Sequence, residues 1–135
     1  MAILFPSDEW VQELMAVVNA SEEYAKAAEN WEGDLFFVVE RGAGLPEDHY
    51  LYMDLWHGEC RSAGEFSPGE KSPEFEIRAP LATWRQVLEG KLDPIRGLTT
   101  RRLKLKGNLM KVMKSPRAAL ALVECAREID TRYPR

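Results

Sequence analysis

The sequence has few of the residues that build disulfide frameworks, metal centres or membrane spans. Only two of its 135 residues are cysteines and two are histidines. Small secreted domains depend on several disulfides, and structural metal sites use about four closely spaced ligands. Cys60 and Cys125 are therefore expected to be free, buried thiols. No apolar run approaches the ~20 residues of a membrane span, and residues 1–6 are too short for a signal peptide and lack its basic flank, so we expect a cytoplasmic protein.

The composition excludes disorder and indicates a single domain. Apolar residues make up 45% of the chain and aromatic residues 10%, which is enough apolar surface to drive folding. A chain of 135 residues normally folds around one core and needs no disulfide or metal for stability. We therefore expect residues 1–135 to form one domain.

The charges are unevenly distributed along the chain. Residues 1–80 hold 17 acidic and 5 basic side chains, a net charge of −12, whereas residues 81–135 hold 5 acidic and 13 basic side chains, a net charge of +8. The formal net charge of −4 therefore hides a dipolar sequence.

Apolar residues at three- and four-residue spacing predict helices near both ends of the chain. The second helix is expected to include Trp31, and the last one to run about four turns to near Tyr133. The predicted helical regions are 7–31, 81–100 and 108–133. The predicted capping residues at helix starts are Ser7, Ser21, Asp93, Asn108 and Ser115.

Between these helical regions, alternating and β-branched segments predict strands. Four lie within 34–79 and are joined by turns that contain glycine, and a fifth lies within 101–107. The predicted strands are 34–40, 49–57, 59–66, 75–79 and 102–106. Grouped strands with helices at the ends indicate an α+β domain, in which helices cover one face of a five-stranded, mostly antiparallel sheet.

Residues typical of catalytic and metal sites do not form a complete set. The chain contains no Gly-x-Ser-x-Gly motif, and the loop 42–44 lacks the third glycine of a dinucleotide-binding loop. His49, His57 and Cys60 form at most a partial metal set, which ordinary histidines at strand ends explain more simply. Asp54 within a strand is either a polar contact for a ligand or a hydrogen-bonded surface residue. We expect no catalytic residue, metal or cofactor.

A basic segment runs from Arg85 to Arg117, with ten lysines or arginines and only two acidic residues. Nucleic-acid binding is disfavoured because the segment has no recognition-helix pattern and the whole chain is acidic. On the predicted strand, the cations Arg102, Lys104 and Lys106 are expected to lie beside Glu74, Glu76 and Arg78 on the wet face of the neighbouring strand. The cations on the short helices are either ordinary surface charges or contacts for phosphates and lipid headgroups, and both interpretations stay open.

The short helices of the C-terminal part carry many large apolar side chains. Packed on a sheet, such helices enclose either a solid core, which is the more common outcome, or a cavity. Met110 and Met113 favour an adaptable apolar surface because their thioether side chains are flexible.

The stretch from Phe75 to Lys114 contains two motifs at a characteristic separation. Residues 90–94 (Gly-Lys-Leu-Asp-Pro) follow a helix that contains Trp84, and residues 102–108 form an alternating strand that ends in Gly-Asn. These residues resemble the lipid-binding domain of the sterol carrier protein 2 family. The resemblance implies an α+β fold with a five-stranded sheet and an apolar tunnel that holds sterols, fatty acids, fatty acyl-CoA or phospholipid, in a carrier and not an enzyme.

The resemblance also implies which residues contact the ligand, and the apolar C-terminal helix adds Leu120. The predicted tunnel residues are Phe75, Ile77, Trp84, Val87, Leu88, Ile95, Leu98, Thr99, Leu109, Val112, Met113 and Leu120. The predicted headgroup or membrane contacts are Lys91, Arg96, Lys111 and Lys114.

Three features depart from the family pattern. Thr99 is polar, which favours a fatty chain or an amphipathic ligand over a sterol. Met110 stands where the family often has glycine and would narrow the tunnel. A long helix, Pro116 to Arg132, would cap the tunnel mouth or fill it.

The leading hypothesis is a non-catalytic, cytoplasmic lipid carrier for a fatty acid, a fatty acyl-CoA or a sterol-like ligand. The alternative is an interaction module of the same fold, filled by Trp84, Met110 and Leu120, that acts through a protein partner or as a dimer. A third, less supported hypothesis is an enzyme for acyl thioesters with His57 or Asp54 as its base.

Overall fold

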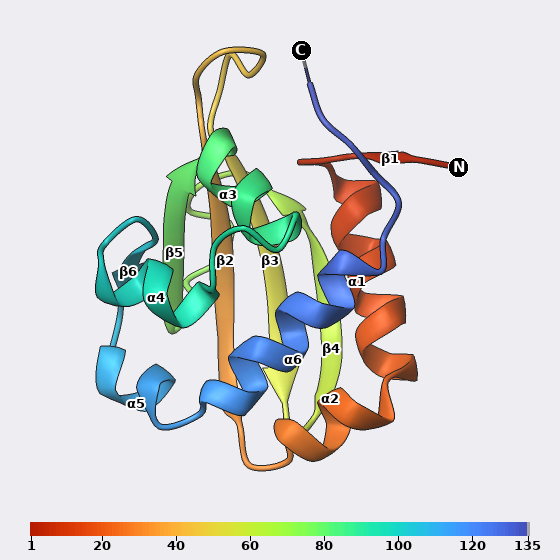
Figure 1. Ribbon diagram of the computed structural model, residues 1–135, viewed down its shortest axis with the longest axis vertical. Coiled ribbons are helices and arrows are strands. Elements are labelled where there is room, and N and C mark those ends of the chain that lie inside the picture. Colours follow the sequence, from red (N-terminus) through yellow and green to blue (C-terminus); the bar gives the residue numbers. More distant parts are fainter. Residues whose placement is uncertain (135) are drawn as a thin grey trace.

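The computed structural model describes residues 1–134, which form six helices and seven strands (Figure 1). The helices are α1 (Asp8–Ala20), α2 (Glu22–Ala27), α3 (Leu81–Leu88), α4 (Pro94–Thr99), α5 (Leu109–Met113) and α6 (Pro116–Arg127). The strands are β1 (Ile3–Leu4), β2 (Glu32–Glu40), β3 (His49–Trp56), β4 (Glu59–Phe66), β5 (Phe75–Pro80), β6 (Lys104–Lys106) and β7 (Thr131–Arg132). Within these residues, no helix has both the length and the apolar character needed to cross a membrane.

Five of the strands form one sheet in the order β4-β3-β2-β5-β6. The pair β2–β5 is parallel and the other three pairs are antiparallel. This arrangement confirms the predicted α+β class and the five-stranded, mostly antiparallel sheet.

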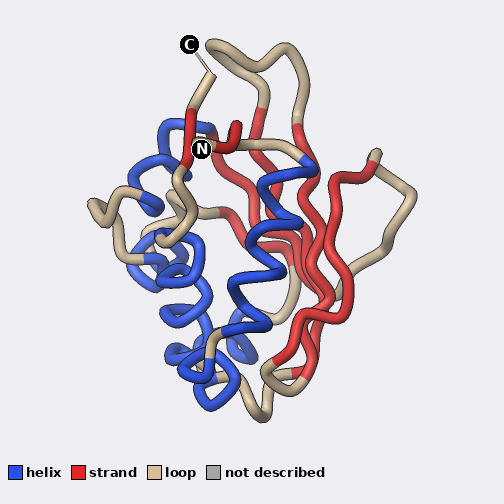
Figure 2. Tube along the Cα trace, turned by 90° about the vertical axis from the view of Figure 1, so that its right-hand side faces the viewer, coloured by secondary structure: helices blue, strands red, loops and turns tan. Residues whose placement is uncertain are grey.

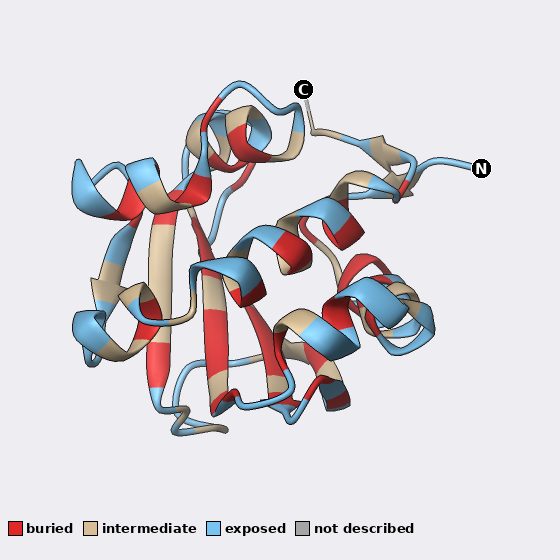
Figure 3. Ribbon diagram, turned by 60° about the horizontal axis from the view of Figure 1, so that its bottom comes forward, coloured by how far each residue is buried: buried red, intermediate tan, exposed pale blue. Residues whose placement is uncertain are grey.

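Alternate residues of β2 face the helices. Leu35 pairs with Met53 and Phe75, and Phe37 pairs with Ile77. The helices gather on this side of the sheet (Figure 2), and buried residues mark the surfaces of sheet and helices that turn toward each other (Figure 3). The main apolar core therefore lies between the sheet and the helices.

The opposite face of the sheet carries a second, smaller apolar cluster. Its members are Phe36, Val38 and Tyr52, with Tyr50 and Phe66 packed against them. The ammonium group of Lys71 lies 4.9 Å from the ring centroid of Tyr52 and 5.0 Å from that of Phe66. The loop 67–74, which joins β4 to β5, thus contributes a cation that covers part of this cluster.

Side-chain caps form at most of the predicted helix starts. Ser7 accepts a hydrogen bond from the backbone N–H of Trp10 at 3.0 Å, and Asp93 accepts from those of Ile95 and Arg96 at 2.8 and 3.1 Å. Ser21 and Asn108 cap α2 and α5 in the same way. Ser115 precedes α6, but its side chain makes no capping bond.

The structure corrects both predicted helix ends. The helix α2 stops at Ala27, and Trp31 lies beyond it, where its carbonyl accepts the N–H of His57 at 2.7 Å. The helix α6 ends at Arg127 and not near Tyr133, because the chain then forms β7, which pairs in parallel with β1. These two-residue strands were not predicted, since two residues show no periodicity.

The strand β6 is shorter than predicted. It begins at Lys104, whereas Arg102 lies in the preceding turn and donates to the side chain of Gln86. In the register with β5, Lys106 lies opposite Glu76 and Lys104 opposite Arg78, both of which were expected neighbours, whereas Arg102 is not among the paired residues. Only one of the three cations therefore lies opposite an acidic residue, and within residues 1–134 the carboxylate of Glu76 pairs with Arg78 and not with Lys106.

Gly107, between β6 and α5, allows the chain to approach the sheet closely. Its φ is 129°, and a Cβ here would lie 2.7 Å from Cδ1 of Phe75 and 3.0 Å from the carbonyl oxygen of Glu74. Gly107→Ala is expected to lower the free energy of unfolding by about 1–3 kcal/mol, through backbone strain and overlap. Urea denaturation measures this loss.

The matched control is Gly42→Ala. No atom lies within 4 Å of the Cβ position of Gly42, so this change should alter the free energy of unfolding by at most about 1 kcal/mol. Equal losses in the two variants would contradict the role given to Gly107.

Candidate functional site

A cavity of about 90 Å³ lies between the sheet and the helices that cover it. Residues of β2, β3 and β5 form one wall, and residues of α3, α4, α5 and α6 form the other. No charged side chain lines this cavity. A water molecule needs only about 10–15 Å³ of such space and several polar partners, so an apolar cavity of this size favours an apolar guest over water.

Six of the predicted tunnel residues line this cavity. They are Phe75 and Ile77 of β5, Trp84 and Val87 of α3, Leu98 of α4 and Val112 of α5. Their side chains come from four elements within residues 75–113, and the fold brings them together around one space.

The other predicted tunnel residues lie elsewhere. Leu88 lines a second cavity, described below. The residues that line neither cavity are Ile95, Thr99, Leu109, Met113 and Leu120. Leu109 and Leu120 are 42% and 40% exposed, and Met110, which was expected to narrow the tunnel, is 63% exposed.

Much of the lining comes from residues that were not predicted. Leu35 and Phe37 of β2 contribute to the sheet side. The contribution of α6 consists of Ala118, Ala119, Leu122 and Val123. The sequence does contain a signal for the side of α6 that packs on the core, since Ala118, Ala121, Leu122 and Cys125 recur at three- and four-residue spacing. Three of these four side chains are small, so the pattern was less conspicuous than the larger Leu120.

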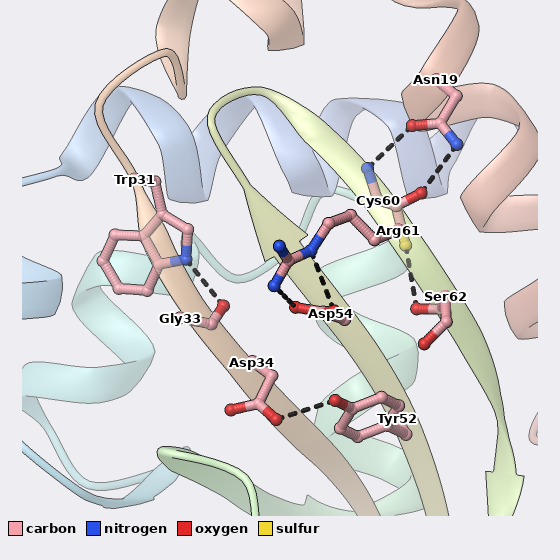
Figure 4. Close-up of polar contacts among 9 residues, drawn as sticks. All are labelled: Asn19, Trp31, Gly33, Asp34, Tyr52, Asp54, Cys60, Arg61 and Ser62. Carbon is pink, nitrogen blue, oxygen red and sulfur yellow. Dashed lines mark hydrogen bonds and ion pairs between the residues drawn. The ribbon is translucent and has the colours of Figure 1, made fainter.

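The indole N–H groups of the lining are bonded to the backbone. Trp31 donates to the carbonyl of Gly33 at 3.0 Å, as Figure 4 shows, and Trp84 donates to the carbonyl of Val38 at 3.0 Å. Both tryptophans therefore present only ring surface to the cavity.

The hydroxyl groups of the lining belong to Tyr24 and Ser115. Burial raises the pKa of Tyr24 well above its usual value, and the nearby Cys60 and Cys125 add to this shift. The tyrosine is therefore neutral at any physiological pH. A guest in this cavity meets apolar groups and at most two neutral hydroxyls.

A second apolar cavity of about 50 Å³ lies beside the first. The residues that line both are Phe37, Trp84, Val87, Leu122 and Val123. The rings of Phe37 and Trp84 pack edge to face with their centroids 5.7 Å apart. Shared side chains, which can change rotamer, thus stand between the two cavities.

The predicted headgroup contact Lys111 is held within the protein. Its ammonium group lies 2.8 Å from Oε2 of Glu74 and donates to the carbonyl of Glu32 at 2.6 Å. It also lies 5.3 and 5.5 Å from the ring centroids of Trp31 and Phe75, which line the cavity. Lys111 therefore ties α5 to the sheet beside the cavity.

The other three predicted headgroup contacts are on the surface. Lys91 is 71% exposed and lies 3.4 Å from a carboxylate oxygen of Glu89. Arg96 and Lys114 are exposed on α4 and directly after α5. The structure thus places these three cations around the short helices, outside the cavity.

The residues considered for catalysis do not face the cavity. His57 lies in the turn after β3, where its ring contacts Oε2 of Glu32 at 2.5 Å and the carbonyl of Glu29 at 2.8 Å. Asp54 accepts two hydrogen bonds from Arg61 (Figure 4), at 3.0 and 3.2 Å. Neither residue lines either cavity, so the geometry gives no support to an acyl-thioester enzyme that uses them as a base.

The cysteines and histidines do not form a metal site in the part of the chain that the structure covers. Residues 1–134 contain no group of three or more potential metal ligands. Cys60 and Cys125 are free and buried, as predicted. Burial raises the pKa of the Cys60 thiol to about 12, so this thiol is unreactive at neutral pH.

Comparisons with known proteins agree with this architecture. The model of the SCP-2 sterol transfer family matches residues 11–119. The crystal structure of a sterol carrier protein 2 is 40% identical to this chain with a TM-score of 0.83, and the match covers 91% of this chain and 97% of that one. No curated protein matches this chain.

Two further solved structures share the fold. A protein of Thermus thermophilus, described as possibly a sterol carrier protein, is 39% identical with a TM-score of 0.80, over 92% of this chain and 88% of that one. The apo form of sterol carrier protein 2 from Yarrowia lipolytica is 20% identical with a TM-score of 0.60, over 88% of each chain. The family match spans most of the chain, and the motifs of residues 90–94 and 102–108 lie within it. This chain belongs to the SCP-2 sterol transfer family.

Proposed function

We propose that this protein is a non-catalytic lipid carrier that holds a single-chain lipid, a fatty acid or a fatty acyl-CoA, between its sheet and its helices. The observation that carries this proposal is the cavity of about 90 Å³, whose lining contains no charged side chain. The second cavity of about 50 Å³ extends the same apolar region beyond Trp84 and Phe37.

The dimensions favour a narrow guest over a broad one. Pockets for compact ligands usually measure about 300–1,000 Å³, so each cavity must widen before a ligand enters. A flexible chain needs side-chain movements along its path, whereas a rigid sterol ring system needs the helices themselves to move apart. Burial of ten methylenes at about 0.8 kcal/mol each supplies roughly 8 kcal/mol before ordering costs, which is enough for micromolar affinity.

Displacement of a fluorescent fatty acid by saturated fatty acids of increasing length tests this function. We expect each added methylene to strengthen competition about three- to fourfold until the chain spans both cavities, and cholesterol to compete more weakly. Failure of every fatty acid to bind or displace at high micromolar concentration would overturn the proposal. Stronger competition by cholesterol would overturn the assignment to single-chain ligands.

A closed interaction module is the second candidate, and the small volume of the two cavities favours it. In that case, the protein acts through a partner or as a dimer, and the cavities are ordinary packing defects of the core. This candidate predicts no lipid in native mass spectra of the purified protein and no displaceable fatty acid. Met110 and Leu120, which were expected to fill the tunnel in this alternative, are both exposed and do not fill it.

A further inference from the structure

One stretch of the chain has no acidic residue. Between Asp93 and Glu124 lie eight lysines or arginines and neither aspartate nor glutamate, in a protein whose formal net charge is −4. This stretch comprises α4, β6, α5 and the first two thirds of α6. In Figure 1, α4, β6 and α5 lie at the left edge of the molecule, and α6 begins beside α5 and runs from there across the sheet.

The cations of this stretch are free of acidic partners, with one exception. Among the ion pairs within residues 1–134, the only one from this stretch joins Lys111 to Glu74. The other seven lysines and arginines are exposed. Their mutual repulsion is uncompensated, which is the arrangement expected where an anionic surface is the partner.

The acidic groups that border the stretch are already engaged. Glu74 pairs with Lys111 at 2.8 Å, and Glu76 pairs with Arg78 at 3.5 Å. The carboxylate of Asp93 accepts the N–H groups at the start of α4. Glu124, at the other end of the stretch, pairs with Arg127 at 2.8 Å. None of these carboxylates therefore forms an ion pair with the seven exposed cations.

Large apolar side chains are exposed among these cations. Of the six large apolar side chains that are exposed within residues 1–134, three belong to this stretch: Leu109, Met110 and Leu120. Leu109 and Met110 occupy the start of α5, between Lys106 and Lys114. Apolar side chains flanked by cations are typical of segments that lie in the interface of an anionic bilayer.

The same elements form part of the cavity wall. Leu98, Leu103, Val112, Ser115 and Ala119 line the cavity from α4, α5, α6 and the segments that join them. If this surface touches a bilayer, the part of the cavity wall that these elements form lies next to the lipid.

We propose that Lys106, Leu109, Met110, Lys114, Arg117 and Leu120, which we call the α5 face, form a docking site for an anionic lipid bilayer. This inference rests on the proposed lipid-carrier function and specifies where the carrier meets the membrane. The cations attract the surface of the bilayer, and the apolar side chains of α5 enter its interface. Lys111 stays with Glu74 and keeps α5 attached to the sheet.

Flotation with lipid vesicles tests the α5 face. The unmodified chain is expected to float with vesicles of phosphatidylcholine containing phosphatidylserine, and much less with vesicles of phosphatidylcholine alone. In the variant Lys106→Glu, Lys114→Glu, Arg117→Glu, we expect at least about a 100-fold loss of vesicle affinity, since each cation near such a surface contributes roughly fivefold. Met110→Ser is expected to weaken vesicle binding without removing its dependence on phosphatidylserine.

A matched variant separates the α5 face from net charge. The control variant is Lys26→Glu, Arg41→Glu, Arg132→Glu, which changes the net charge by the same amount at three exposed positions outside this face. It should lose much less vesicle affinity than the variant of the α5 face, because only its net charge differs from that of the unmodified chain. Both triple variants should still bind a fluorescent fatty acid in vesicle-free solution. Absence of fatty-acid binding would count against the proposed function. Fatty-acid binding by the unmodified chain without any vesicle binding would overturn the docking site alone.

Three further results would also overturn the inference. The first is equal binding to vesicles with and without phosphatidylserine, and the second is equal loss of vesicle binding in the two triple variants. The third is binding to a DNA duplex that depends on the α5 face, in the absence of any vesicle binding, which would identify nucleic acid as the partner.

Discussion

Replacing Ala119 with phenylalanine is expected to lower the affinity for single-chain lipids about 50-fold, because the ring would occupy space that otherwise takes about three methylenes at 0.8 kcal/mol each. Ala119 is half-buried on α6 and lines the cavity of about 90 Å³. The added ring fills existing apolar space, so the fold should be retained. Displacement of a fluorescent fatty acid measures the affinity, and urea denaturation verifies that the variant is folded.

Ala16→Phe is the matched control for this change. Ala16 is exposed on α1 and lines neither cavity, so its replacement should leave lipid affinity unchanged. If Ala119→Phe is folded and binds fatty acids as tightly as the unmodified chain, the ligand does not occupy this cavity.

Replacing Trp84 with alanine is expected to lower the free energy of unfolding by about 3–5 kcal/mol. Trp84 is 7% exposed, borders both cavities and packs its ring against Phe37. The change removes this contact and the hydrogen bond to the carbonyl of Val38, and it leaves a larger void where the two cavities meet. Thermal or urea denaturation measures the loss, and Trp84→Leu is the milder variant if alanine prevents folding.

Trp56→Ala supplies the comparison for Trp84. Trp56 is 38% exposed, and its ring stacks on Arg61 at 4.5 Å, so its removal should cost about 1 kcal/mol or less. In the Trp84 variants the joined cavities are also expected to admit cholesterol more readily relative to a fatty acid. Similar losses of stability for Trp84→Ala and Trp56→Ala would contradict the central position given to Trp84.

The sequence was sufficient to predict the main elements, because their signals are local. Asp93 before proline and Asn108 after glycine are capping patterns, and each caps its helix in the structure. The alternation of Phe75, Ile77 and Ala79 identified β5, whose register then places Phe75 and Ile77 against the helices. Short-range patterns of this kind need no knowledge of the rest of the fold.

The orientation of the short helices could not be predicted in the same way. The helices α4 and α5 have six and five residues, which is less than two turns, so apolar spacing does not define which side is buried. The family resemblance assigned these helices to the tunnel as a whole, and it therefore included Ile95, Leu109 and Met113, which do not line either cavity. On α6 the prediction chose Leu120, which is exposed, whereas the buried residues of this helix are Ala118, Ala121, Cys125 and Ala126.

The structure shows where the basic residues of the C-terminal part of the chain lie. Part of the positive excess is neutralised, since Lys111 pairs with Glu74, Arg85 with Glu89, and Arg127 with Glu124. The remaining cations lie mainly on α4, β6, the segments that flank α5 and the start of α6, and some residues of these elements line the cavity. We infer that the polarity of the chain serves to orient the cavity toward an anionic surface, which is the inference that the vesicle experiment tests.

The central claim is that a lipid chain occupies the space between the sheet and the helices. The most direct test records nuclear Overhauser effects between a bound fatty acid and the methyl groups of the protein labelled with carbon-13. We expect contacts from the acyl chain to Leu35, Val87 and Val112, and none to Leu120, whose side chain is exposed and lines neither cavity. Contacts to Leu120 without contacts to Leu35, Val87 or Val112 would contradict it.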